Sequence, residues 1–329
     1  YTFNDVDGDS EGGSSYRWLR NGAVIPGAIT TSYILQAIDS GTDITFEVTP
    51  VALTGVISGS AVASAAVSVS NSAPTASAVN ITDDNGGNAV VGDSLSGSYS
   101  YADIDNDVEG VSTFRWLRDG TAIAGATTTS YTLVAADSGT SITFEVTPVA
   151  VTGITSGTAV ISAGMAVINS VPVASAVSIA DDNGGNAFVG DSLSASYSYT
   201  DVDNDLEGSS SFRWLRNGSP IAGAVTTSYT LVAADSGASI SFDVTPVALT
   251  GVSPGATVAA TPLIVLNSAP VASAVSITDD NGGSILVGDS LSGNYTYSDV
   301  DNDAEGISSF RWLRDGAAIP GATTATYTL

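Results

Sequence analysis

Four carboxylates fall within the eight residues DIDNDVEG at 103–110, and no basic residue stands among them. The octet recurs as DVDGDSEG from Asp5, DVDNDLEG from Asp201 and DVDNDAEG from Asp299, each copy 98 residues after the one before. The acids of the four octets are Asp5, Asp7, Asp9, Glu11, Asp103, Asp105, Asp107, Glu109, Asp201, Asp203, Asp205, Glu207, Asp299, Asp301, Asp303 and Glu305. They make up 16 of the chain's 34 acidic residues, so most of the remaining chain is much less charged.

Crowded carboxylates of this kind point to cation binding. Each pair within about 4 Å costs on the order of 1 kcal/mol even in water. In extended backbone, acids at alternate positions lie about 6.5 Å apart on one face, so they can bracket an ion only if the loop curls. Gly8 and Asn106, at the middle of their octets, favour such curling. The octets are therefore predicted to bind Ca²⁺, which prefers oxygen ligands. A solvated acidic loop that keeps the chain soluble is the alternative, and the sequence leaves it open.

The arginines are predicted to be engaged elsewhere. All eight lie in the four copies of RWLR, and the chain has no Lys or His. Arg115 is expected on the outward face of a strand, opposite Glu145 on the neighbouring strand, 30 residues further along. The same spacing relates Arg17 to Glu47 and Arg213 to Asp243. Such cross-strand pairs contribute about 0.2–1 kcal/mol each, and they leave the octets without a basic partner.

A second acidic segment, DDNGG, occurs three times with the same period. Its acids are Asp83, Asp84, Asp181, Asp182, Asp279 and Asp280. In a head-to-tail array of sandwiches, Asp83, Asp84 or Asp137 of one repeat is expected to face the octet of the next repeat. The segment is a second candidate Ca²⁺ site, although Asp-Asn-Gly is also a good turn by itself. Its spacing does not match an EF-hand loop, which needs a Glu at the twelfth position.

Composition and charge exclude several classes of function. A formal charge of −26 gives no basic surface for a phosphate backbone or for anionic lipid. Apolar residues make up 43% of the chain, so it is expected to fold. The longest apolar tract, GTAVISAGMAVI near residue 160, is too short to span a bilayer. With no His, Cys or Lys to activate a nucleophile, and with the same acids in every repeat, an enzyme is not expected.

Internal repetition predicts the domain organisation. The only four tryptophans, at 18, 116, 214 and 312, lie 98 residues apart. The phrases NSAP, NSVP and NSAP begin at Asn71, Asn169 and Asn267, and each proline favours an extended residue before it. The predicted units are a partial repeat 1–71, complete repeats 72–169 and 170–267, and a partial repeat 268–329. The sequence is expected to be a window from a longer array.

Short alternating strands separated by Gly, Asn and Asp turns predict an all-β fold. SLSGSYSY should bury Leu95, Tyr99 and Tyr101 on one face, and FRWLRDG should bury Trp116 before an Asp-Gly hairpin turn. SYTL, SITFEV and TAVISAGMAVI supply the further strands. About seven strands in about 100 residues is the rhythm of an immunoglobulin-like sandwich.

The order FRWLRDG, IAGAT, YTLVAADSG resembles the immunoglobulin-like repeats of large bacterial surface proteins and adhesins, and the NSAP joints resemble cadherin-like repeats of the same proteins. The resemblance covers all four units. Unlike many immunoglobulin domains, the chain has no inter-sheet cysteines, and no Tyr stands at the corner before the strand that SITFEV forms. It implies a tandem array of Ig-like β-sandwich domains on the bacterial cell surface.

The expected function is a structural stalk, stiffened by Ca²⁺ at its joints through contacts between neighbouring repeats. An adhesive region for host or matrix glycan or protein would then lie outside this segment. Two alternatives stay open. One is a filament or sheath subunit whose like chains associate through exposed strand edges. The other is a glycan- or protein-binding module, for which an Arg–aromatic patch at RWLR is a candidate, although Trp116 is more simply a core residue.

Overall fold

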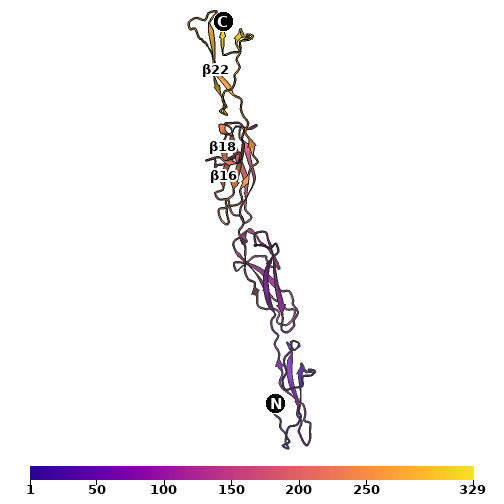
Figure 1. The fold of residues 1–329 in the computed structure, drawn as a ribbon. Helices are drawn as coiled ribbons and strands as arrows, with labels where there is room; N and C mark the ends of the chain where they lie inside the picture. The colour runs from indigo at the N-terminus through magenta and orange to yellow at the C-terminus, as the bar shows by residue number, and fades with distance from the viewer. The chain divides into compact units, whose positions relative to one another are not determined.

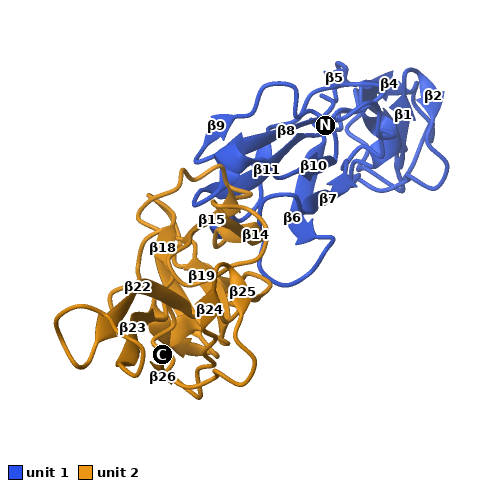
Figure 2. Cartoon of the chain, turned by 90° about the horizontal axis from the view of Figure 1, so that it is seen from above, with its two compact units in different colours: residues 1–169 blue, residues 170–329 orange.

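The computed structural model describes residues 1–329, in two compact units, Tyr1–Asn169 and Ser170–Leu329 (Figures 1 and 2). Almost all of the regular structure is β-strand, with three single-turn 3₁₀ helices. No helix is long and apolar enough to cross a membrane. The fold class predicted from the sequence, all-β in tandem sandwich units, is confirmed. The finer division at residues 71 and 267 stays a prediction.

The elements follow the sequence repeat. Residues 1–71 contain β1 (Ser15–Arg20), β2 (Ala23–Val24), η1 (Ala37–Asp39), β3 (Asp43–Thr49), β4 (Val62–Ala63) and β5 (Val67–Ser68). Residues 72–169 contain β6 (Thr75–Asp83), β7 (Ser94–Ala102), β8 (Thr113–Arg118), β9 (Thr121–Ala122), β10 (Ser130–Thr132), η2 (Ala135–Asp137), β11 (Ser141–Thr147), β12 (Val160–Ile161) and β13 (Met165–Ala166). Residues 170–267 contain β14 (Val173–Asp181), β15 (Ser192–Thr200), β16 (Ser211–Arg216), β17 (Ser219–Pro220), β18 (Ser228–Thr230), η3 (Ala233–Asp235), β19 (Ser239–Thr245), β20 (Val258–Ala259) and β21 (Leu263–Ile264). Residues 268–329 contain β22 (Val271–Asp279), β23 (Ser290–Ser298), β24 (Leu313–Arg314), β25 (Ala317–Ala318) and β26 (Thr326–Thr328).

Each complete repeat is built from two antiparallel sheets. In residues 72–169, one sheet has the order β10-β7-β6 and the other β12-β11-β8-β9, with β13 also pairing with β11. The third repeat has the same pair, β14-β15-β18 and β17-β16-β19-β20, with β21 on β19. A single sheet, here of three or five strands, leaves its apolar face exposed unless another layer covers it. The two sheets of a repeat therefore pack on each other.

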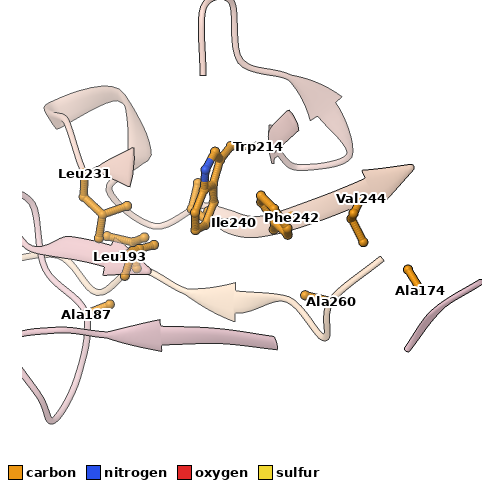
Figure 3. Packing of buried hydrophobic residues seen from close by; sticks show 10 residues of the cluster. Ala174, Ala187, Leu193, Trp214, Leu231, Ile240, Phe242, Val244 and Ala260 are labelled. Atoms are coloured by element: carbon orange, nitrogen blue, oxygen red, sulfur yellow. The ribbon is translucent and has the colours of Figure 1, made fainter. Parts of the chain in front are cut away.

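The core lies between these sheets. In the third repeat Trp214, Phe242 and Val244 are completely buried, together with Leu193 and Ile240 (Figure 3). The Trp214 and Phe242 rings lie 5.1 Å apart between their centroids, within the favourable range for aromatic pairs. The second repeat has the equivalent cluster around Trp116 and Phe144. The tryptophan of RWLR is thus a core residue in both complete repeats.

The strand pattern follows the predicted alternation, with one exception. Leu95 is buried on β7, and β8 ends in a hairpin turn at Asp119 and Gly120, whose φ angles are 45° and 77°. Two positive φ angles are what a type I′ turn requires. The single last strand predicted from TAVISAGMAVI is instead two short strands, β12 and β13. Between them Ser162 donates its N–H to the Phe144 carbonyl at 2.9 Å, and its Oγ accepts the Phe144 N–H at 3.0 Å.

Candidate metal centres

The octet at 103–110 connects β7 to β8, and its own hydrogen bonds curl it. Asp103 Oδ1 accepts the backbone N–H of Asp105 at 2.8 Å, and the Asn106 N–H donates to the Asp103 carbonyl at 3.2 Å. Asn106 has a φ of 62°, in the left-handed region that Asn tolerates better than most residues. The curl expected from the sequence is therefore present, and Asn106 makes it possible.

The same turn is present in the other octets. Asn204 and Asn302 have φ angles of 63° and 64°, and Gly8 has one of 85°. The first aspartate of each octet accepts the N–H two residues further on. The repeated acids and the Asn or Gly between them thus give the same turn in each octet.

The curl gathers three aspartates at three of the four octets. Within each group, one carboxylate oxygen from each residue lies within 4.8 Å of the others. The groups are Asp103, Asp105 and Asp107; Asp201, Asp203 and Asp205; and Asp299, Asp301 and Asp303. Carboxylate oxygens at these separations are close enough to be bridged by one hard cation with ligand distances of about 2.3–2.6 Å.

The three groups also contain buried oxygens without a donor. Asp203 and Asp301 are only 8% and 7% exposed, and the Oδ1 atom of each is buried with no hydrogen-bond partner. The Oδ2 atoms of Asp103, Asp201 and Asp299 are buried and unpartnered in the same way. Leaving a buried charged oxygen without a partner is costly. A cation held by the three carboxylates would remove this cost, so the residues fit the ion that the sequence predicts.

The remaining oxygens of the group in the second repeat bind neighbouring segments. Asp105 Oδ2 accepts the Ser72 N–H at 2.5 Å. Asp107 accepts the Thr152 hydroxyl on Oδ1 and the Asn71 amide on Oδ2, the latter at 2.8 Å. The hydrogen bonds from Thr152 and Asn71 lower the pKa of Asp107, so this carboxylate stays ionised below its usual range. Ser268 and Asn267 bind Asp301 and Asp303 in the same way.

The glutamate of each octet binds a different set of partners. Glu109 Oε1 accepts the hydroxyls of Tyr99 at 2.6 Å and Ser112 at 2.7 Å. Ser112 Oγ in turn accepts the Val149 N–H, which ties the octet to the segment after β11. Glu11, Glu207 and Glu305 accept the equivalent Tyr and Ser hydroxyls. The glutamates thus stand outside the three groups, and their role as ligands stays a prediction.

The first octet makes the same turn without forming such a group. Asp5 Oδ1 accepts the N–H of Asp7 at 2.9 Å and that of Asp9 at 3.4 Å. Asp9 Oδ1 accepts the Thr54 hydroxyl at 2.5 Å, as Asp107 accepts that of Thr152. Metal binding by Asp5, Asp7 and Asp9 stays a prediction.

The DDNGG segments are turns closed by their own side chains. Asp83 Oδ1 accepts the Asn85 N–H at 3.0 Å, Asn85 Oδ1 accepts the Ser94 N–H at 2.9 Å, and Asp84 Oδ2 accepts the Ser96 hydroxyl at 2.8 Å. Asp181 and Asp182, and Asp279 and Asp280, have equivalent partners. The Oδ2 atoms of Asp83, Asp181 and Asp279 are buried and unpartnered, but no group of three acids forms at these turns. Metal binding here also stays a prediction.

The expectation that Asp137 faces the next repeat is wrong. Its carboxylate is completely buried and forms an ion pair with Arg118 at 2.6 Å. It also accepts the Tyr131 hydroxyl at 2.8 Å and the Val134 N–H at 2.7 Å. Burial and the bond to Asp137 raise the pKa of Tyr131 to about 12. Asp137 is therefore a structural residue, and the constant spacing of 19 residues between this Arg and Asp in three repeats is the signal that could have found the pair.

The other predicted ion pairs are confirmed. Arg115 and Glu145 are directly opposite on β8 and β11, and the guanidinium makes two bonds to the carboxylate, at 2.5 and 3.0 Å. Arg17 pairs with Glu47 at 2.5 Å, and Arg213 with Asp243 at 2.8 Å. The second arginine of RWLR in each of these three repeats is bound to a buried aspartate. None of the ion pairs therefore involves an octet aspartate.

Comparisons with known proteins give only a coarse likeness. No protein-family model and no curated protein matches the sequence. Among solved structures, the chain is similar to a Ca²⁺-stabilised adhesin that helps an Antarctic bacterium reach out and bind ice. The TM-score is 0.28 and the identity 15%, over 88% of this chain and 74% of that one. It is also similar to three N-terminal domains of the highly immunogenic outer capsid protein of bacteriophage RB49. That match has a TM-score of 0.25 and 12% identity, over 80% of this chain and 91% of the other.

Proposed function

We propose that this chain is a segment of an extracellular bacterial stalk, made of immunoglobulin-like sandwiches whose joints are stiffened by Ca²⁺. One observation carries the proposal. Three aspartates converge beside the segment that joins two repeats, and buried oxygens among them have no partner. Because no arginine pairs with those aspartates, a metal ion is the partner that fits.

Calcium is the ion that best matches the ligands. All of the candidate ligands are oxygens, which disfavours the softer transition metals. Magnesium demands near-ideal octahedral geometry and gives up its waters reluctantly, whereas Ca²⁺ accepts irregular sites with more ligands. Affinities in the range of about 10⁻⁴–10⁻³ M are typical of extracellular calcium modules. A site of this strength would be filled outside the cell.

The mechanical effect follows from what the same aspartates hold. In the second repeat, Asp105 and Asp107 accept hydrogen bonds from Ser72 and Asn71 of the joint, and Asn71 also donates to Ser40 of the preceding repeat at 3.0 Å. An ion that fixes the two carboxylates would stabilise these hydrogen bonds. Without the ion, repulsion between the carboxylates weakens the same contacts. Occupancy would thus control how freely the joint bends.

The stalk is favoured over the alternative of a laterally associating filament. An exposed strand edge can template pairing with another chain, and a bulge is one way in which proteins blunt it. Each of the long edge strands β6, β14 and β22 has its register interrupted by a bulge. The proposed role is non-catalytic, in accord with the lack of His, Cys and Lys.

Calorimetric titration of the whole chain with CaCl₂, and separately with MgCl₂, tests the proposal. We expect saturable Ca²⁺ binding with at least one ion for each of the three aspartate groups and weaker binding of Mg²⁺. Small-angle scattering with calcium and then with a chelator measures the mechanical effect. The chain should become more flexible in the chelator. Absence of saturable binding, or a scattering curve that does not respond to the ion, would count against the proposal.

A further inference from the structure

The first and fourth octets make the same backbone turn but differ in what the turn brings together. The Gly8 N–H donates to the Asp5 carbonyl at 3.3 Å, and the Asn302 N–H donates to the Asp299 carbonyl at 3.2 Å. Asp5 Oδ1 accepts the N–H groups two and four residues further on at 2.9 and 3.4 Å, and Asp299 Oδ1 accepts the equivalent groups at 2.8 and 3.4 Å. Only the fourth octet gathers three aspartates into a group. The turn alone is therefore not sufficient to gather them.

The threonine that binds the third aspartate does not explain the difference. In the first octet Thr54 donates its hydroxyl to Asp9 at 2.5 Å, yet no group forms. In the fourth octet the group forms although Asp303 accepts no Thr hydroxyl. The Thr contact is thus neither sufficient nor necessary for the group.

The joint, defined as the Asn-Ser pair that begins each NSAP or NSVP phrase, accounts for the difference. Asp301 Oδ2 accepts the Ser268 N–H, and Asp303 Oδ2 accepts the Asn267 amide at 2.8 Å. Asp301 is only 7% exposed, whereas the equivalent Asp7 of the first octet is exposed. Joint residues also bind the second and third octets, through Ser72 to Asp105, Asn71 to Asp107 and Ser170 to Asp203. Every octet that is bound by a joint forms a group.

Hydrogen bonds donated from outside a group of like charges offset the repulsion within it. Each donor stabilises the ionised carboxylate, and a bond to one oxygen fixes the side chain so that the other oxygen stays inside the group. Asp301 shows this division, because Oδ2 binds the joint and Oδ1 is the buried oxygen without a partner. Partners of this kind behind metal ligands typically contribute about 10–100-fold to metal affinity.

We propose that the joint assembles the cation site of the octet that follows it. The joint residues are positioning residues: they bind the outer carboxylate oxygens and leave the inner ones for the ion. This inference rests on the proposed function, because it says how the same sites become able to bind Ca²⁺. Coupling between two binding events is reciprocal, so docking of the joint and binding of the ion strengthen each other. An octet without a bound joint, such as the first, binds Ca²⁺ much more weakly. The positioning residues are Asn71, Ser72, Ser170, Asn267 and Ser268.

Hydrogen exchange of the whole chain at increasing CaCl₂, read by mass spectrometry, measures each octet separately. Peptides over residues 103–110, 201–208 and 299–306 should gain protection in one range of calcium concentration. The peptide over residues 5–12 should need at least about tenfold more calcium. A first octet that becomes protected together with the other three would overturn the inference.

One variant and a matched control test the joint directly. Asn267 is exposed, and its amide donates to Asp303 at 2.8 Å and to Ser236 at 3.3 Å. Asn267→Ala should raise the calcium midpoint of residues 299–306 about 10–100-fold and leave the second and third octets unchanged. Ser236→Ala removes only the longer bond and should leave all midpoints unchanged.

The calcium midpoint separates positioning from a general effect on stability. If Asn267 only stabilised the repeat, its loss would speed exchange without calcium and leave the midpoint where it was. An unchanged midpoint in Asn267→Ala, or an equal rise in Ser236→Ala, overturns the inference while the proposed calcium binding stands. If calcium protects no octet of the wild-type chain, the proposed function is refuted, and the inference with it.

Discussion

Replacing Asp201 by Asn should change the stability of the third repeat in opposite directions with and without calcium. Asp201 Oδ1 accepts the Asp203 N–H at 2.8 Å, a bond that Asn can also accept, and Oδ2 is buried without a partner. Asp201→Asn therefore keeps the turn while it removes one of three like charges. In calcium it also removes a charged ligand.

The magnitude follows from the spacing of the carboxylates. Their oxygens lie within 4.8 Å of one another, and at that distance two unit charges repel by about 0.9 kcal/mol in water. Loss of the Asp201 charge relieves two such pairs, so the metal-free third repeat should gain about 1.8 kcal/mol. That corresponds to about a 19-fold smaller fraction of locally open molecules. At a calcium concentration 100 times the dissociation constant, ion binding stabilises the wild-type repeat by about 2.7 kcal/mol. The variant should lose much of this stabilisation.

Hydrogen exchange read by mass spectrometry resolves the effect repeat by repeat. In chelator, peptides of the third repeat should exchange more slowly in Asp201→Asn than in wild type, and in calcium they should exchange faster. The second repeat, with Asp103 intact, serves as an internal control. Asp119→Asn removes one charge at a hairpin where two other repeats carry Asn21 and Asn217, so it should leave the third repeat unchanged. If the third repeat of Asp201→Asn exchanges at the same rate as wild type, both in chelator and in calcium, the reasoning is refuted.

Three further predictions concern the sandwich itself. Ala176 is exposed at the β14 bulge and has a left-handed φ of 50°, which Gly adopts at lower cost. Ala176→Gly should therefore stabilise the chain by about 1 kcal/mol, and an unchanged urea midpoint would contradict this. Arg118→Ala leaves the completely buried Asp137 without its cation and should cost about 3 kcal/mol, against about 0.2–1 kcal/mol for Arg17→Ala, whose partner Glu47 is more exposed; equal losses in urea unfolding would argue against the buried pair. The pKa of Tyr131, raised to about 12 by burial and Asp137, implies stability that is complete below the usual value of 10.0 and lost as the pH rises through 12. Ultraviolet titration of tyrosinate checks this, because Tyr131 in the folded chain should ionise near pH 12, and ionisation near 10 would contradict it.

Local chemistry made much of this molecule predictable from its sequence. The 98-residue period and the alternation around Leu95 and Trp116 were sufficient for the fold class, because each strand has one buried face. The pairing of Arg115 with Glu145 was predictable because an Arg and an acid recur 30 residues apart, as expected when two antiparallel strands keep one register in every repeat. The curl of the octet followed from Asn106, whose side chain tolerates the left-handed backbone.

Features set by tertiary contact were not predictable in the same way. The position of Asp137 near a turn suggested exposure, and only the packed sandwich brings Arg118 and Tyr131 to its carboxylate. The last strand is split in the third repeat too, where Ala260 stands in place of Ser162, so no single side chain in the sequence marks the break. Asn71 also lies close to Gly153, more than 80 residues further along the chain, and no local sequence pattern predicts a contact at that separation.

The most direct test of the account is a crystal structure of the chain grown in calcium, with anomalous scattering recorded at a wavelength at which the ion contributes. The account predicts a peak at a distance of about 2.3–2.6 Å from carboxylate oxygens of Asp103, Asp105 and Asp107, and matching peaks at the two equivalent groups. Well-ordered aspartate side chains around water alone, at saturating calcium, would contradict it.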